Sequence, residues 1–211
     1  MPFFYDVFMD QFLTEKEFEI IEDADFLLTK ARVIQKVVGK FDELRVKMIE
    51  KVNKSDIVAP ANLDITKGKV FRGENYKNLP YVVLDYPKHF SKQSVFAIRT
   101  MFWWSNFFSV TLHLEGEDLE STRETLINNK EMLRGKDSWF CCNSTPWEYH
   151  YQEDNYVELD SLTSDVLESE LGNRKFIKLS RKIDLNEYGN LEDFCLETLT
   201  LYLRLIARSS G

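Results

Sequence analysis

Two extended runs separated by a short polar break constrain the fold of this chain more than any other feature. Residues 95–104 and 107–114 are rich in aromatic and β-branched side chains, and only Ser105 and Asn106 lie between them. Two such runs around a two-residue break are typical of a β-hairpin. The sequence therefore predicts two neighbouring antiparallel strands near the middle of the chain.

The predicted turn also sets which side chains of the hairpin share a face. If Ser105 and Asn106 are the two turn residues, Arg99 lies on one face with Met101, Val110 and Leu112. A buried guanidinium needs a carboxylate, a carbonyl or an anionic ligand, because burying it unpaired costs several kcal/mol. Three interpretations stay open: a structural ion pair with Asp85 as the expected partner, a clamp for an anionic ligand, or a different hairpin register.

Helical patterns stand before and after the extended segments. Thr14 and Glu17 form a capping box, which predicts a helix from Glu15. Apolar residues at spacings of three and four over residues 34–52 predict a long amphipathic helix that ends near Asn53. Residues 119–134 and 161–171 predict two shorter helices. Asn190 is the expected N-cap of a broad apolar helix at the end of the chain.

The order of these elements predicts the fold class. Further strands are expected at residues 69–72, 81–84, 138–142, 147–151 and 175–180, with Pro87 closing the second of these. Helices that bracket hairpin-connected strands favour an α+β fold: a mostly antiparallel sheet of about five to six strands with N-terminal and C-terminal helices packed on it. Since the sequence shows no repeat and no linker, we expect one domain over residues 1–211.

Charge and composition set several classes of function aside. With 35 acidic and 27 basic residues the net charge is −8, which repels nucleic acid and anionic membrane surfaces alike. We find no apolar stretch of about 18 residues and no signal-peptide pattern at the N-terminus, so we expect no membrane span and no export. The three cysteines, Cys141, Cys142 and Cys195, suit a reducing, cytoplasmic compartment because two are adjacent and the count is odd.

Motifs that bind cofactors or metals are missing from the sequence. Neither the dinucleotide-binding glycine pattern nor the P-loop occurs. The three histidines and three cysteines form no metal-ligand spacing. We therefore expect no cofactor and no metal, and the sequence identifies no catalytic residue, although a Cys–His pair could still assemble in space.

Two polar segments are candidates for ligand contacts. Residues 72–81 form a predicted loop in which Arg72, Tyr76, Lys77 and Tyr81 offer charged and phenolic groups to an acidic or phosphorylated small molecule. The alternative is a solvated connection with its tyrosines packed beneath it. The basic run at residues 174–182 is interpreted as a solvated edge strand protected by its lysines, or as a contact for an anion or an acidic partner.

Part of the chain resembles a known group of sequences. Residues 73–76 (GENY), 79–87 (LPYVVLDYP) and 97–104 (AIRTMFWW) resemble a family of bacterial proteins of similar length for which no activity is established. The resemblance covers about a fifth of the chain. It implies a bacterial, cytoplasmic protein, and it carries over no catalytic residue.

Three functions follow as hypotheses. The first is a binding protein for a small anionic molecule, and the second is an enzyme in which Arg99 or Lys77 stabilises negative charge and Asp85 or His113 carries a proton. The third is an interaction or scaffold protein that self-associates, as a homodimer, through its aromatic hairpin. The candidate ligand-binding residues are Arg72, Tyr76, Lys77, Tyr81, Asp85, Arg99, Trp103 and His113.

Overall fold

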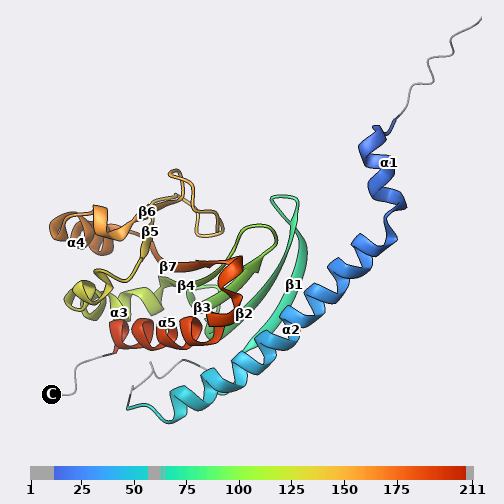
Figure 1. Cartoon of the computed structure of the whole chain (residues 1–211). Helices are drawn as coiled ribbons and strands as arrows, with labels where there is room; N and C mark the ends of the chain where they lie inside the picture. Colours follow the sequence, from blue (N-terminus) through green and yellow to red (C-terminus); the bar gives the residue numbers. More distant parts are fainter. Residues whose placement is uncertain (1–11, 57–62, 64, 208–211) are drawn as a thin grey trace, which may run out of the picture. The chain divides into compact units, whose positions relative to one another are not determined.

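The computed structural model describes residues 12–56, 63 and 65–207 (Figure 1). Its helices are α1 (Glu15–Glu22), α2 (Ala24–Asn53), α3 (Glu117–Asn128), α4 (Ser164–Asn173) and α5 (Leu191–Ile206). Its strands are β1 (Lys69–Tyr76), β2 (Leu79–Phe90), β3 (Ser94–Trp103), β4 (Phe107–Gly116), β5 (Trp139–Cys141), β6 (Tyr156–Glu158) and β7 (Phe176–Asp184). Three short 3-10 helices, η1 (Lys130–Leu133), η2 (Leu159–Ser161) and η3 (Leu185–Asn190), connect them.

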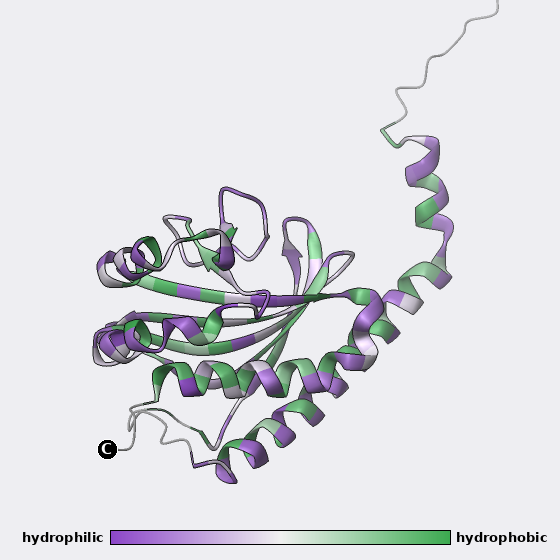
Figure 2. Cartoon of the chain, turned by 60° about the vertical axis from the view of Figure 1, so that its left-hand side comes forward, coloured by the Kyte–Doolittle hydropathy of each residue, from purple (hydrophilic) through white to green (hydrophobic). Residues whose placement is uncertain are grey.

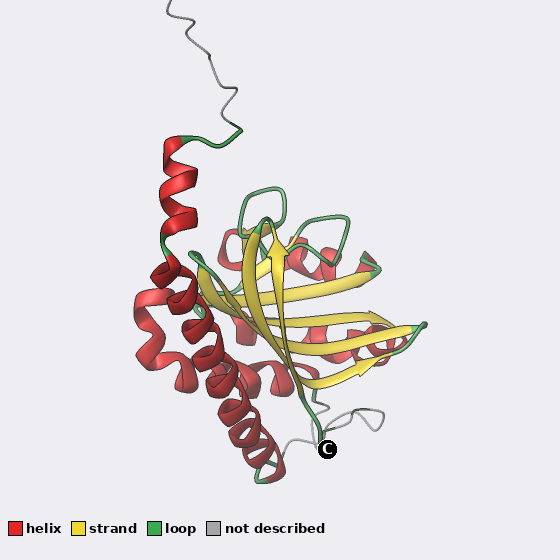
Figure 3. Ribbon diagram, turned by 90° about the vertical axis from the view of Figure 1, so that its right-hand side faces the viewer, coloured by secondary structure: helices red, strands yellow, loops and turns green. Residues whose placement is uncertain are grey.

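The strands form one antiparallel sheet. Their order is β1-β2-β3-β4-β7-β5-β6, and every neighbouring pair is antiparallel. Figure 3 shows them as a single twisted layer. The predicted α+β class is thus confirmed, with seven strands instead of five or six. β5 lies within the predicted strand at residues 138–142, whereas β6, at the edge of the sheet, has no counterpart among the predicted strands.

Helices from both ends of the chain cover one face of the sheet. α3 and α5 pack on β3 and β4, and the part of α2 that follows Lys36 lies beside them (Figures 1 and 3). Phe41, Leu44 and Met48, at helical spacing on α2, are completely buried, which confirms the predicted amphipathic helix. On this face the sheet contributes Ile98, Val110 and other apolar side chains to the core.

Contacts divide the chain at Lys36 into two compact units. The first unit contains α1 and the first turns of α2. The predicted capping box starts α1, since the Thr14 backbone N–H donates to Glu17 Oε2 at 2.7 Å and the Glu17 N–H donates to Thr14 Oγ1 at 3.3 Å. Asp23 separates α1 from α2 and accepts from the Phe26 N–H at 2.9 Å. The second unit contains the rest of α2 and the whole sheet.

The hairpin forms as predicted, but its register differs by one residue. The turn has three residues, because the Asn106 N–H donates to the Trp103 carbonyl and Ser105 adopts a left-handed φ of 60°. Trp103 therefore faces Phe107, and Arg99 faces Thr111. The expectation that Arg99 shares a face with Val110 and Leu112 is wrong, since both point toward the helices.

Three further sequence-based expectations about strands are wrong. β2 does not close at Pro87 but continues to Phe90 through a register shift between Asp85 and Lys88, where a proline is tolerated. Residues 147–151 form a loop, because their backbone amides bond to a tyrosine side chain instead of a strand. β7 is no edge strand, since it lies between β4 and β5.

Candidate functional site

A row of polar side chains crosses the sheet face that is turned away from α5. Asp85, Arg99, Thr111 and Ser180 face one another in register across β2, β3, β4 and β7. Facing residues of neighbouring strands point to the same side, so the four side chains form a continuous line. Thr111 Oγ1 and Ser180 Oγ lie 2.7 Å apart. Polar groups therefore occupy the centre of a face whose rim is aromatic.

Arg99 is held by protein groups on this face. Its guanidinium donates to both carboxylate oxygens of Asp85, at 2.7 and 2.9 Å, and to the hydroxyl of Tyr149 at 2.5 Å. It also lies over the rings of Phe71 and Tyr149. The expected structural ion pair with Asp85 is therefore confirmed. An anionic ligand at Arg99 would have to compete with a buried, bidentate carboxylate.

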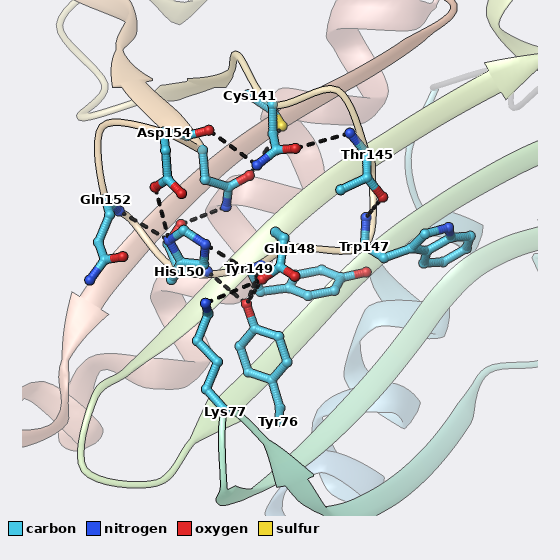
Figure 4. Close-up of polar contacts among 12 residues, drawn as sticks. Tyr76, Lys77, Cys141, Thr145, Trp147, Glu148, Tyr149, His150, Gln152 and Asp154 are labelled. Atoms are coloured by element: carbon cyan, nitrogen blue, oxygen red, sulfur yellow. Dashed lines mark hydrogen bonds and ion pairs between the residues drawn. The ribbon is translucent and has the colours of Figure 1, made fainter.

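The loop between β5 and β6, residues 142–155, covers this face, and we call it the roof segment. Tyr76, at the end of β1, holds it: the Tyr76 hydroxyl accepts from the N–H groups of Tyr149 and His150, at 2.6 and 3.1 Å, and donates to Glu148 Oε2 at 2.9 Å (Figure 4). Lys77 Nζ lies 3.7 Å from the same carboxylate. One tyrosine thus satisfies two loop amides that have no strand partner.

Lys178 is the most unusual residue of the face. Its side chain is fully buried, and its Nζ donates to the Glu148 carbonyl at 2.5 Å while lying over the rings of Tyr149 and Tyr156, at 4.2 and 5.3 Å from their centroids. No carboxylate forms an ion pair with it in the described residues. Burial, with a further contribution from the charge of Arg99, lowers the pKa of Lys178 to about 8.

His113 lies next to Lys178 across β4 and β7. The rings of Trp147 and Phe176 contact it edge-on. Burial, followed by the positive charges of Lys178 and Arg99, lowers the pKa of His113 to about 3. An imidazole of this kind is neutral at pH 7 and is poorly matched to proton transfer there. This low pKa therefore does not favour His113 as the proton carrier of an enzyme at pH 7.

The structure brings most of the predicted site residues to one face of the sheet. Tyr76, Tyr81 and Trp103 pack into an aromatic cluster at the β1-β2-β3 end of the face. Arg72 is different: it is exposed and points to the opposite side of β1 from Phe71, because side chains alternate along a strand. The prediction that residues 72–81 form a loop is therefore wrong, since most of them are strand. Ligand binding by these residues stays a prediction.

The sequence analysis does not place Lys178 or the roof segment on this face. The prediction that Lys178 is a solvated lysine of an edge strand is wrong, because β7 has neighbours on both sides and the side chain is buried. The flanking residues offered a signal, since Ile177 and Leu179 are apolar and such runs are typical of interior strands. Trp103, Phe107 and Phe108 near the hairpin tip are buried, and Trp104 is half-buried. Self-association through the hairpin stays a prediction, with Trp104 as the only partly exposed anchor among these four residues.

Surface hollows lie on both sides of the sheet. A groove of about 640 Å³ on the helix side is lined by residues of α2, η1, the loop after η1 and α5, among them Lys51, Lys136, Leu196, Leu201 and Arg204. A smaller hollow of about 260 Å³ lies beside Trp139 and Lys182. Within the described ranges no three His, Cys, Asp or Glu side chains are placed to hold a metal ion. No helix in those ranges has the length and apolar character needed to cross a bilayer.

These features define an α+β protein with a seven-stranded antiparallel sheet, covered by helices on one face and by a loop over a buried polar cluster on the other. Comparison with protein-family models, with curated proteins and with solved structures finds no match for the chain. Its function is therefore inferred from its own surfaces.

Proposed function

We propose that this protein is an interaction protein that docks onto another protein through residues 12–36, which we call the docking segment. The observation that carries the proposal is the exposure of large apolar side chains there. Seven of them are 48–91% exposed: Phe12, Phe18, Ile20, Ile21, Phe26, Leu27 and Leu28. Figure 2 shows apolar and polar residues side by side along α1 and the first turns of α2. A surface of this kind marks an interaction site.

The docking segment has little to stabilise it by itself. No residue of α1 is buried, and a helix of eight residues is too short to be stable in water without packing. Its last turn has no basic residue to interact with the helix dipole. Covering these half-exposed side chains would contribute about 1 kcal/mol each, or about 7 kcal/mol per chain. A partner helix would supply the packing that the segment lacks.

The charge of the segment favours a protein partner over a membrane or nucleic acid. The docking segment contains six acidic and four basic residues. The acidic residues, all within residues 14–25, repel an anionic lipid headgroup or a phosphate backbone, and charges of both signs suit the mixed charges of a protein surface. The acidic residues and the exposed apolar side chains together suit packing against a partner helix.

The proposal is tested by photo-crosslinking of the full chain in its own host cell. A benzophenone amino acid replaces Leu27 on the apolar side of α2, and the matched control replaces Thr29 on the opposite side of the same helix turn. We expect protein adducts at position 27 and few at position 29. Equal adducts at both positions, lipid adducts, or no protein adduct at position 27 would reject a docking function.

The groove beside α5 favours a second candidate function, binding of a small anionic molecule. Lys51, Lys136 and Arg204 line it together with two carboxylates, Asp193 and Glu197, and with Leu196 and Leu201. Because the cations outnumber the carboxylates, an anion with an apolar tail fits its chemistry. A thermal-shift titration with decanoate tests this, with Lys51→Met plus Lys136→Met as the variant. A shift that is absent in the wild-type chain, or unchanged in the variant, would count against the groove.

We also propose a cytoplasmic setting for the protein. The three free cysteines support a reducing compartment, because disulfides form and persist mainly in oxidising ones. Fractionation of the host cell is the direct test.

A further inference from the structure

Charge is segregated along the docking segment. Residues 14–25 carry Glu15, Glu17, Glu19, Glu22, Asp23 and Asp25 against a single Lys16. Residues 26–36 carry Lys30, Arg32 and Lys36 and no acidic residue at all. The change of sign occurs at Phe26, Leu27 and Leu28, which are also the exposed apolar residues at the start of α2. The segment therefore has an acidic half, an apolar centre and a basic half.

Such a segment is complementary to itself in one orientation only. If two copies lie antiparallel, the acidic half of each lies along the basic half of the other, and both apolar centres meet near the two-fold axis. If they lie parallel, like charges face each other along the whole segment, which is unfavourable. The arrangement is isologous, so it closes as a dimer and does not continue into a filament.

We propose that the partner of the docking segment is a second copy of this chain, bound antiparallel with the acidic half of each copy against the basic half of the other. This inference rests on the proposed function, because it names the occupant of the same surface. The apolar centre around Leu27 supplies the packing, and the two charged halves set the orientation. Each dimer contains two such contacts, related by the two-fold axis.

Two charge-reversed variants test the inference in the full-length protein. The first, Glu15→Lys with Glu19→Lys and Glu22→Lys, makes most of the segment basic and spares Glu17 of the capping box. The second makes the whole segment acidic: Lys30→Glu, Arg32→Glu and Lys36→Glu. A control with the same net charge as the first reverses three exposed residues of the other unit: Glu117→Lys, Glu124→Lys and Glu153→Lys.

Sedimentation equilibrium in 0.1 M salt measures self-association of each variant. We expect the wild-type chain and the control to dimerise, and each charge-reversed variant alone to dimerise at least tenfold more weakly. Mixed in equal amounts, the two variants should form a heterodimer, seen as a mixed mass in native mass spectrometry. Because the charges are exposed, raising the salt to 1 M should weaken the heterodimer and relieve the repulsion within each variant.

Crosslink mapping tests the orientation separately. A benzophenone at Phe18 should react with residues 30–36 of the second copy if the pair is antiparallel, and with residues 15–21 if it is parallel. To distinguish the two copies, one is isotopically labelled, so that adducts within one chain are recognised and excluded.

The outcomes separate this inference from the proposed function. If position 27 forms adducts only with a different protein, the proposal that a second copy is the partner is wrong, and the proposal of a docking function is supported. If Leu27→Lys abolishes dimerisation while both charge-reversed variants dimerise as the wild type does, the antiparallel charge pairing is overturned and self-docking stands. If the chain is monomeric at every concentration up to its solubility limit and position 27 forms no adduct, both proposals fail.

Discussion

Replacing Arg99 with methionine is expected to destabilise the protein by about 3–5 kcal/mol, because it leaves the Asp85 carboxylate buried without its counter-charge. Asp85 is 3% exposed and accepts two hydrogen bonds from the guanidinium, at 2.7 and 2.9 Å. Methionine approximates the length of the arginine stem, so the loss comes mainly from the unpaired charge and only in part from packing.

Urea unfolding at pH 7, followed by tryptophan fluorescence, measures this loss. A second change, Asp85→Leu in the Arg99→Met background, removes the stranded charge and should return the free energy of unfolding to within about 1.5 kcal/mol of the wild type. The single and double variants together give the coupling energy between the two residues. Lys175→Met, an exposed cation at the start of β7, should change stability by less than about 0.5 kcal/mol.

Two results would contradict a structural ion pair. The first is that Arg99→Met lowers the free energy of unfolding by less than about 1 kcal/mol, and the second is that the losses of Asp85→Leu and Arg99→Met add in the double variant. Either result would mean that Asp85 has another strong partner and that the guanidinium is available to a ligand. A ligand-clamping role for Arg99 would then become the better interpretation.

Three further variants test the buried polar cluster. The pKa of His113 is lowered to about 3 in the folded state, whereas it is about 6.5 in the unfolded chain. The unfolded state therefore binds a proton that the folded state does not, and the free energy of unfolding decreases as the pH falls below about 6.5. Between pH 6.5 and 5 the wild type should therefore lose about 2 kcal/mol more than His113→Gln in urea unfolding. The pKa of Lys178 is lowered to about 8 in the folded state, whereas it is about 10.4 in the unfolded chain. Above pH 8 the folded state therefore releases the proton first, and the free energy of unfolding increases as the pH rises toward about 10.4. Between pH 8 and 9.5 the free energy of unfolding of the wild type should rise by about 2 kcal/mol relative to that of Lys178→Met. For either variant, a free energy of unfolding that changes with pH in parallel with the wild type would contradict the prediction. Tyr76→Phe leaves two roof-segment amides unsatisfied and should raise amide exchange at Tyr149 and His150 at least tenfold, with Tyr188→Phe, an exposed tyrosine, as the control. Unchanged amide exchange at Tyr149 and His150 would show that Tyr76 does not hold the roof segment in place.

Elements with strong local signals could be predicted from the sequence. The capping box at Thr14, the amphipathic stripe from Ile34 to Val52 and the two central strands of the hairpin all appear where the pattern placed them. These features depend on residues a few positions apart, which is why periodicity and capping rules locate them. The expected partner of Arg99 was also right, since β2 and β3 pair Asp85 with it.

Features that depend on a single residue of register or on strand order could not be predicted. The residues Trp104-Ser105-Asn106 are compatible with a two-residue turn and with a three-residue turn. The two turns differ by one residue of register, and one residue of register exchanges the faces of β4 relative to β3. β7 lies between β4 and β5, although α3, β5, β6 and α4 all come between β4 and β7 in the sequence. Adjacency in sequence is only a tendency, so the buried position of Lys178 was missed.

By itself, the sequence determined the helices, most of the strands, the α+β class and the segregated charges of the docking segment, because each of these is a local or compositional property. Only the tertiary structure decided that Lys178, His113 and Arg99 share one covered face, and it did so by placing four strands side by side and laying residues 142–155 across them. The pKa values of these groups follow from that burial, since desolvation and the nearness of other charges exist only once the chain is folded.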